Sequence, residues 1–232
     1  MKKIILAVML MIMGIGTMSA QRLGRPYHVN RLDTYDLYYG FRLGYNTSSL
    51  RFSSTDISCD NVSGMNFGFI AGFPLGNSSV IFEPGLLYSV KGGKAKDHNL
   101  VKNEVHMHGL EIPLVLKYDV TLPTMSDISF QPFFGGFFDL GMGGTTKKDN
   151  GLERKKLKTY SDRFKRFDAG LRMGCGLNIE FFYIELAYDL GIANLGQDSK
   201  AFNGPEGMFP SYNDWDDEVK SGCFSINFGV NF

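Results

Sequence analysis

The chain has 232 residues and a formal net charge of +0, from 24 basic and 24 acidic side chains. That balance gives no support to a nucleic-acid partner, which needs a basic surface. Three cysteines at irregular spacing fit neither a disulfide framework nor a metal site. We expect no cofactor and no catalytic constellation, and the composition stands out instead for 28 glycines and 14% aromatic residues.

The first twenty residues have the pattern of a secretory signal peptide. Lys2 and Lys3 precede an apolar stretch that ends near Ile15, and small residues end at Ala20. The stretch is too short to favour a single membrane anchor, which needs roughly 20 apolar residues. We therefore predict a signal peptide over residues 1–20 and export across the inner membrane. Residues 21–35 are polar and are predicted to be a periplasmic lead-in, either a spacer or a partner site.

Most of the remaining chain alternates apolar with small or polar residues, which is the period of a β-strand. The mean hydropathy is only −0.10 and no second long apolar run follows, which excludes a helical membrane protein. The pattern is clearest in the last strand, which we expect to close a barrel through Phe224, Ile226, Phe228, Val230 and Phe232. Together the predicted strands cover 36–47, 62–75, 80–91, 104–119, 128–143, 167–179, 182–192 and 221–232.

The connections between these strands alternate between short and long. The short ones are 76–79, 120–126 and 180–181, and the long ones are 48–61, 92–103, 144–163 and 194–218. Bacterial membrane barrels have an even number of strands, short periplasmic turns and long external loops. The sequence therefore predicts a single all-β domain over residues 36–232, an eight-stranded antiparallel up-and-down transmembrane β-barrel with both termini in the periplasm.

One face of each predicted strand is rich in Phe, Leu and Ile, and the other carries glycine and charge. A lipocalin-like soluble barrel would place the apolar face inside, whereas a membrane barrel places it outside. Glycine on the polar face and the terminal Phe232 favour the membrane barrel. Its lumen would then hold Arg42, Glu83, Glu111, Lys117, Asp139, Asp168, Arg172, Glu185 and Asp189.

These lumen charges permit two interpretations, a charge-paired plug or a polar conduit. Unpaired buried charges are costly, which favours the plug. We expect Glu111 or Glu83 to pair with Arg172 or Lys117. His106 and His108 lie two residues apart, as a weak metal site or as a pair at the barrel rim.

Two of the predicted long loops carry opposite charge. The third loop is basic and includes Lys155, Lys156 and Lys158, whereas the fourth is acidic and includes Tyr212 and Trp215. The basic residues suit contact with anionic lipopolysaccharide or with a protein partner. The alternative is that the two loops attract each other as solvated tips.

Four of the predicted strands carry distinctive segments. The most specific is L-E-I-P-L-V-L-K-Y, which contains Glu111 and Lys117. The others are E-P-G-L-L-Y-S-V-K-G-G-K from Glu83, D-A-G-L-R-M-G-C-G from Asp168 and E-L-A-Y-D-L-G from Glu185. These segments resemble the PorT-like outer-membrane β-barrel family of Bacteroidetes, and the likeness covers most of the mature chain. The resemblance implies a barrel in the bacterial outer membrane, and some members of the family serve a protein secretion system.

From these patterns we expect a non-enzymatic outer-membrane barrel that acts as a structural or interaction module, as an accessory of a secretion system. The alternatives are a narrow porin-like channel and a lipid-acting barrel enzyme. The expected partners are outer-membrane lipid and lipopolysaccharide, the barrel assembly machinery, and a periplasmic or secretion-system protein.

Overall fold

The computed structural model describes residues 37–52, 58–76, 78–96, 102–122, 125–149, 154–158, 165–195 and 219–232. All of these residues belong to one compact unit of the chain. The predicted signal peptide and lead-in lie outside the described residues. Within the described residues, no helix has the length and apolarity needed to cross a membrane.

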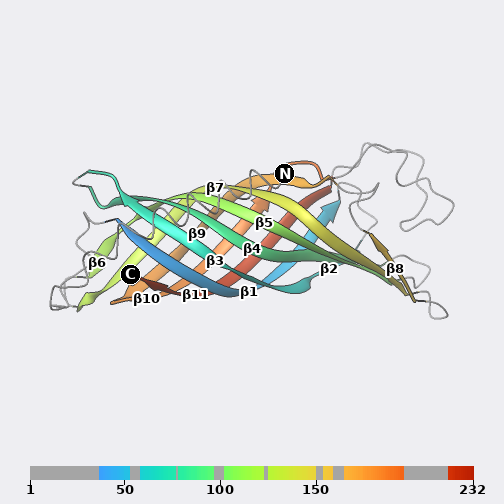
Figure 1. Cartoon of the computed structure of the whole chain (residues 1–232), viewed down its shortest axis with the longest axis horizontal. Helices are drawn as coiled ribbons and strands as arrows, with labels where there is room; N and C mark the ends of the chain where they lie inside the picture. The colour runs from blue at the N-terminus through green and yellow to red at the C-terminus, as the bar shows by residue number, and fades with distance from the viewer. Residues whose placement is uncertain are drawn as a thin grey trace, which may run out of the picture. The chain divides into compact units, whose positions relative to one another are not determined.

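Eight strands form a closed antiparallel ring (Figure 1). Each strand pairs with the next along the chain, and the first pairs with the last, with Leu43 opposite Phe228. This confirms the predicted eight-stranded barrel. The ring consists of β1 (Tyr38–Phe52), β3 (Val62–Pro74), β4 (Val80–Lys96), β5 (Lys102–Tyr118), β7 (Met125–Asp149), β9 (Phe167–Ile179), β10 (Phe182–Gly191) and β11 (Val219–Asn231).

Three short strands lie outside the ring: β2 (Ser58–Asp60) pairs with β4, while β6 (Val120–Leu122) and β8 (Arg154–Lys158) pair with β7. The predicted loops at 48–61, 92–103, 120–126 and 144–163 are therefore wrong in part, because strands occupy much of each. The predicted strands end where the apolar alternation stops. Backbone pairing continues past that point, because an antiparallel ladder satisfies its own hydrogen bonds whatever side chains it carries.

The two ends of the barrel differ. At one end, here called the turn end, neighbouring strands are joined by tight turns, in which Gly76 and Glu180 adopt positive φ of 61° and 55°. The last residue also lies there, since the Tyr39 amide donates to the Phe232 carbonyl at 2.9 Å. The opposite end, here called the hairpin end, carries β2, β8 and the extensions of β4, β5 and β7 (Figure 1).

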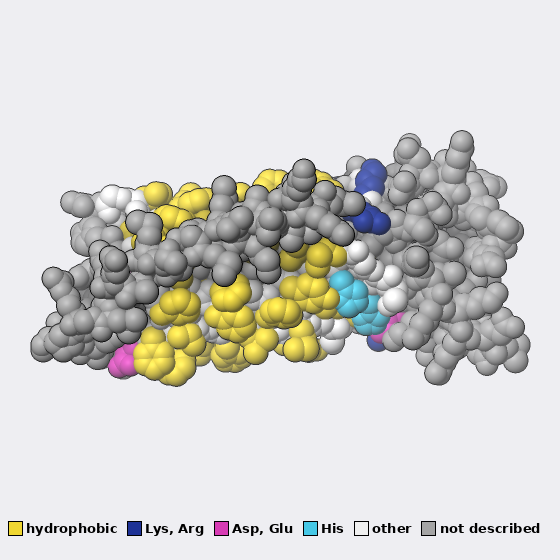
Figure 2. Space-filling model, viewed as in Figure 1, with side chains coloured by type: hydrophobic (Ala, Val, Ile, Leu, Met, Phe, Trp, Pro, Cys, Tyr) yellow, Lys and Arg dark blue, Asp and Glu magenta, His cyan; other side chains and the backbone are white. Residues whose placement is uncertain are grey.

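Side-chain exposure alternates along every ring strand. The outward positions form an apolar band around the barrel (Figure 2), which includes Phe41, Leu43, Phe67, Phe69, Ile112, Leu116, Phe134, Phe138, Leu186, Phe224 and Phe228. The inward positions carry most of the buried polar and charged side chains. This arrangement is that of a membrane barrel and excludes the lipocalin-like alternative, because a water-facing surface would not carry a continuous apolar band.

Candidate functional site: the charged barrel interior

The nine lumen residues predicted from the sequence all point inward, because each occupies the polar phase of its strand. Eight of them are buried, and the Asp139 side chain is 12% exposed. They come from six of the eight ring strands, so the barrel wall brings together groups that lie far apart in the sequence. The buried eight are Arg42, Glu83, Glu111, Lys117, Asp168, Arg172, Glu185 and Asp189.

Nearest the turn end, Glu83 is the centre of the first cluster. Its carboxylate lies 2.8 Å from the Lys117 ammonium and 3.7 Å from the Arg42 guanidinium, and it accepts a 2.5 Å hydrogen bond from the Tyr38 hydroxyl. Lys117 also donates to the Tyr183 hydroxyl at 2.6 Å. Arg42 and Lys117 both lie over the Tyr183 ring, 4.2 and 4.1 Å from its centroid. Every charge in this cluster therefore has a buried partner, as the low dielectric of the interior requires.

Arg172 holds the middle of the barrel. Its guanidinium pairs with Glu111, and it lies 3.2 Å from carboxylate oxygens of both Glu185 and Asp189. Glu185 also lies 3.7 Å from Lys117, which connects this cluster with the one around Glu83. Arginine suits such a position, because its planar fork of donors serves several carboxylates at once.

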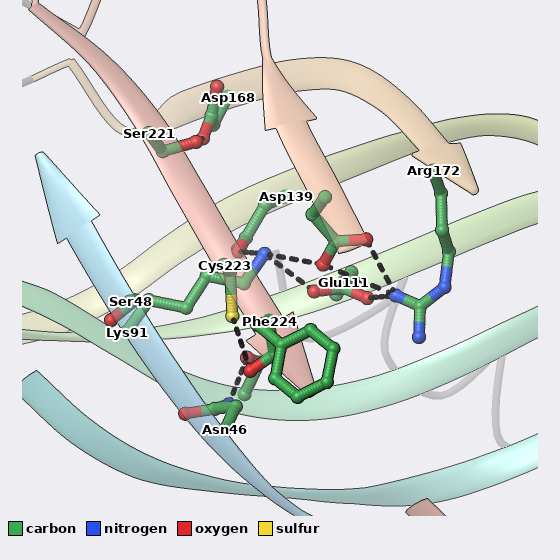
Figure 3. Close-up of polar contacts among 12 residues, drawn as sticks. Asn46, Ser48, Lys91, Glu111, Asp139, Asp168, Arg172, Ser221, Cys223 and Phe224 are labelled. Carbon is green, nitrogen blue, oxygen red and sulfur yellow. Dashed lines mark hydrogen bonds and ion pairs between the residues drawn. The ribbon is translucent and has the colours of Figure 1, made fainter. Parts of the chain in front are cut away.

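Lys91 completes the network on the side of the hairpin end. Its ammonium lies 2.6 Å from Glu111, 3.2 Å from Asp139 and 3.6 Å from Asp189. Figure 3 shows this ammonium among the carboxylates, with Arg172 meeting Glu111 from the other side. The Phe137 ring lies 4.7 Å from the ammonium. A continuous chain of ion pairs therefore runs from Arg42 to Lys91 across the barrel interior.

Sequence reasoning missed three members of this network, Lys91, Tyr38 and Tyr183. A usable signal was present, because each is an even number of positions from a predicted lumen residue on its own strand: Lys91 from Glu83, Tyr38 from Arg42, and Tyr183 from Glu185. The predicted strand over 80–91 ends at Lys91, and Lys91 is not among the residues predicted for the lumen. The strand continues to Lys96, which puts Lys91 inside the barrel.

The other polar side chains of the interior are uncharged or form hydrogen bonds beside the ion-pair network. Asp168 accepts a 2.5 Å hydrogen bond from the Ser221 hydroxyl, and Asn227 donates to Glu185 at 2.9 Å. Asn46 and Ser89 are also buried and lie 3.5 Å apart. Amides and hydroxyls of this kind fill space between the charged clusters.

Glycines allow the two buried tyrosines to lie against the barrel wall. A Cβ on Gly72 would overlap the Tyr38 ring, and one on Gly176 would overlap the Tyr183 hydroxyl oxygen. Both approaches are far closer than van der Waals contact allows. Because these glycines have no side chain, the two tyrosine side chains have room to fill the lumen.

The two histidines lie outside the interior, at the edge of the apolar band. His108 contacts the Tyr88 hydroxyl at 2.8 Å, and His106 lies 2.8 Å from Glu104. Among the described residues, no group of three or more His, Cys, Asp or Glu side chains is arranged to hold a metal ion. Cys175 and Cys223 are both free thiols, and Cys223 is buried in the interior.

The remaining predicted residues lie at the barrel seam and in the long connections. Phe224, Phe228, Val230 and Phe232 point outward on β11, which pairs with β1 and closes the barrel, and Ile226 lies on the same face. Lys155, Lys156 and Lys158 lie in β8, where the register with β7 is described but the side chains are not. Tyr212 and Trp215 lie outside the described residues.

A closed strand ring with an apolar exterior and a packed, charged interior defines an integral membrane β-barrel. The chain belongs to the family of the outer membrane protein beta-barrel domain, whose sequence profile matches residues 20–197. The protein is therefore an outer-membrane β-barrel protein of bacteria, and its location is the bacterial outer membrane. No curated protein matches the chain.

Several solved outer-membrane proteins are similar at low sequence identity. Ail of Yersinia pestis is 14% identical over 84% of this chain and 98% of its own, with a TM-score of 0.38. OprG of Pseudomonas aeruginosa is 13% identical over 84% and 95%, with a TM-score of 0.48. Neisserial surface protein A is 14% identical over 84% and 97%, with a TM-score of 0.40. Because these scores lie below 0.5, the fold assignment rests on the strand ring and the family match.

Proposed function

We propose that the protein is a non-enzymatic outer-membrane barrel with a plugged lumen, which acts as a membrane-anchored structural or interaction module. The observation that carries the proposal is the continuous ion-pair network from Arg42 to Lys91 across the interior. In this proposal the hairpin end faces the outside of the cell and the turn end faces the periplasm, as loop lengths suggest.

The energetics of the interior favour a plug over a channel. An ion passing through would have to displace buried pairs such as Arg172 with Glu185 or Lys117 with Glu83. Separating a buried pair costs about 3–5 kcal/mol, because each charge then lacks both water and its partner. Several such pairs lie one after another along the lumen. The protein would then act through its outward surfaces and its ends, and not through its lumen.

Planar lipid bilayer recording tests this function. The refolded full chain is expected to insert without a steady open conductance. The double variant Lys91→Ala/Arg172→Ala is expected to show conductance. It leaves carboxylates without cationic partners and opens space beside them. A matched control, Lys94→Gln at the hairpin end, should behave as the wild type does. A large steady conductance of the wild-type protein would exclude the plug and support the channel alternative.

The resemblance to the PorT-like family supports a more specific form of this proposal, in which the barrel is an accessory of a protein secretion system. The turn end and residues 21–35 would then contact periplasmic components, while the barrel assembly machinery would recognise β11 together with Phe232, which follows it. Photo-cross-linking from positions in 21–35, followed by mass spectrometry, should recover secretion components. Recovery of the same proteins from a cross-linker at the hairpin end, or of none, would contradict the accessory role.

A further inference from the structure

The hairpin end carries rows of charge that the register of its strands puts side by side. In one row Lys94 lies opposite Glu104, Glu104 opposite Lys147, and Lys147 opposite Lys156. The first two steps join opposite charges, and the Lys94 ammonium lies 3.7 Å from the Glu104 carboxylate. The last step joins two lysines. The pairing of opposite charges that begins between β4 and β5 therefore ends where β7 pairs with β8.

The next row repeats the imbalance, since Lys148 lies opposite Lys155. We call β8 and residues 145–149 of β7 the basic ribbon. It holds six cationic residues and one acidic residue. The register puts Lys147, Arg154, Lys156 and Lys158, with Asp149, on the face that His106 and Glu104 share, and Lys148 and Lys155 on the opposite face. Like charges directly opposite each other destabilise an antiparallel pair. An anion bound along the ribbon would remove that cost.

The basic ribbon begins at the level where the membrane ends. Figure 2 shows the apolar band ending at histidine side chains, beyond which charged side chains follow. His106 lies opposite Thr145, and Thr145 lies opposite Lys158, so the ribbon starts in the row of His106. With about 3.4 Å per residue and the usual strand tilt, the Lys147 row lies about 10 Å beyond His108. The polar layer of a bilayer extends about 5–8 Å beyond the apolar core, so the ribbon borders that layer.

We propose that the basic ribbon binds phosphate groups of lipopolysaccharide in the outer leaflet. Phosphates are multivalent anions held at a fixed height, which matches closely spaced lysines at the bilayer surface. The proposal extends the function proposed above and rests on it in one respect, namely that the hairpin end faces the outside of the cell. It requires nothing of the lumen, so bilayer recordings that revealed a channel would leave the ribbon proposal standing.

The chain itself contains a competing anion, because residues 196–218 include six acidic residues: Asp198, Glu206, Asp214, Asp216, Asp217 and Glu218. An acidic protein outside the cell is a second competitor. The height of the ribbon at the bilayer surface favours the lipid over both. The experiment separates the three occupants.

The first measurements use the wild-type full chain, refolded in non-ionic detergent. Fluorescently labelled lipopolysaccharide and the same material stripped of phosphate are titrated separately, and binding is followed by fluorescence anisotropy. Intact lipopolysaccharide is expected to bind at least about tenfold more tightly than the stripped form. That difference should shrink as the salt concentration rises, because the contacts are between charges.

The variant Lys147→Gln/Lys156→Gln removes the two lysines that lie opposite each other in one row, and Lys147→Arg/Lys156→Arg keeps their charge. Binding is expected to weaken about fivefold for each lysine removed and to stay within about twofold in the arginine variant. Folding of each variant is checked by its heat-dependent shift in gel mobility. Should the double glutamine variant fail to fold, the single variants Lys147→Gln and Lys156→Gln test the ribbon in its place, each with an expected loss of about fivefold.

Four results would overturn the proposal. Equal binding of intact and stripped lipopolysaccharide would remove phosphate as the ligand, and an unchanged affinity of the folded glutamine variant would remove the ribbon as the site. The third is lipopolysaccharide binding that appears only after Asp214, Asp216, Asp217 and Glu218 are changed to Asn or Gln, which would assign the ribbon to the chain's own acidic segment. The fourth is preferential binding of poly-glutamate over lipopolysaccharide by the wild type, which would assign the ribbon to an acidic protein.

Discussion

Among single residues, Arg172 has three acidic partners in the interior, as many as Lys91. Its guanidinium serves Glu111, Glu185 and Asp189, and all four side chains are buried. A buried charge pair is not in itself a large source of stability, because both partners lose their hydration. Loss of one partner is a different matter, since the other then remains charged in a medium that cannot solvate it.

Arg172→Ala is therefore expected to lower the free energy of unfolding by about 3–5 kcal/mol. Urea unfolding of the refolded protein in lipid vesicles measures the change. The matched control is Lys94→Gln, which breaks an ion pair whose side chains are 44% and 32% exposed and should cost less than about 1 kcal/mol. Equal effects of the two substitutions would show that the interior pairs contribute no more than a surface pair.

A second prediction at this scale concerns the space left by glycine. Gly176→Ala would drive a methyl group into the Tyr183 side chain, which is held in place by its hydrogen bond from Lys117. We expect a loss of about 1–3 kcal/mol in the same unfolding assay. Gly143→Ala is the control, because a Cβ there would meet nothing within 4 Å. A Gly176→Ala protein as stable as the Gly143→Ala protein would contradict the tight packing of Tyr183.

The strands could be predicted from the sequence because apolar and polar residues alternate along each of them with a period of two. The apolar side chains face lipid, and the small or polar side chains face a filled lumen. The phase also predicted which way Glu111, Lys117 and Arg172 point. The ends of the strands could not be predicted, because the apolar pattern marks only the part of a strand that contacts lipid. The backbone hydrogen bonds between strands continue beyond that part. The strand character of residues 92–96 and 144–149 is therefore not predicted by the apolar alternation.

The outward phase can be tested on β7. Phe134 lies near the middle of the apolar band with 56% of its side chain exposed. Phe134→Arg is expected to lower the free energy of unfolding in lipid vesicles by about 2–4 kcal/mol, because it places a charge in the hydrocarbon. Phe134→Leu keeps the position apolar and should change stability by less than about 1.5 kcal/mol. A tolerated arginine would mean that this face does not meet lipid.

At the scale of the whole molecule, closure of the ring decides which charges meet. Glu111 and Arg172 lie on strands separated by β7, and Arg42 and Glu83 on strands separated by β3. Alternation predicts that all four point inward, but their heights depend on the stagger between strands, which the sequence does not reveal. The sequence therefore predicts Glu83 and Glu111 as alternative partners of Lys117 and Arg172 and does not distinguish between the two pairings. In the closed barrel Lys117 meets Glu83, and Arg172 meets Glu111.

The central claim is that the lumen is filled, and the native Cys223 thiol reports on that filling directly. This cysteine points into the interior and is 3% exposed. The measurement uses a Cys59→Ser/Cys175→Ser protein, so that Cys223 alone can react, in lipid vesicles with a charged, membrane-impermeant methanethiosulfonate reagent. Thr145→Cys in a Cys223→Ser version of that protein is the control, since Thr145 is exposed at the hairpin end.

Mass spectrometry follows the modification of both proteins over time. We predict that folded Cys223 reacts on the order of 100-fold or more slowly than the thiol introduced by Thr145→Cys in the control, because the barrel must open before the reagent can enter. Unfolding in urea should abolish the difference. Modification of folded Cys223 at the rate of the exposed control would show an open, water-filled lumen and would contradict the plugged barrel.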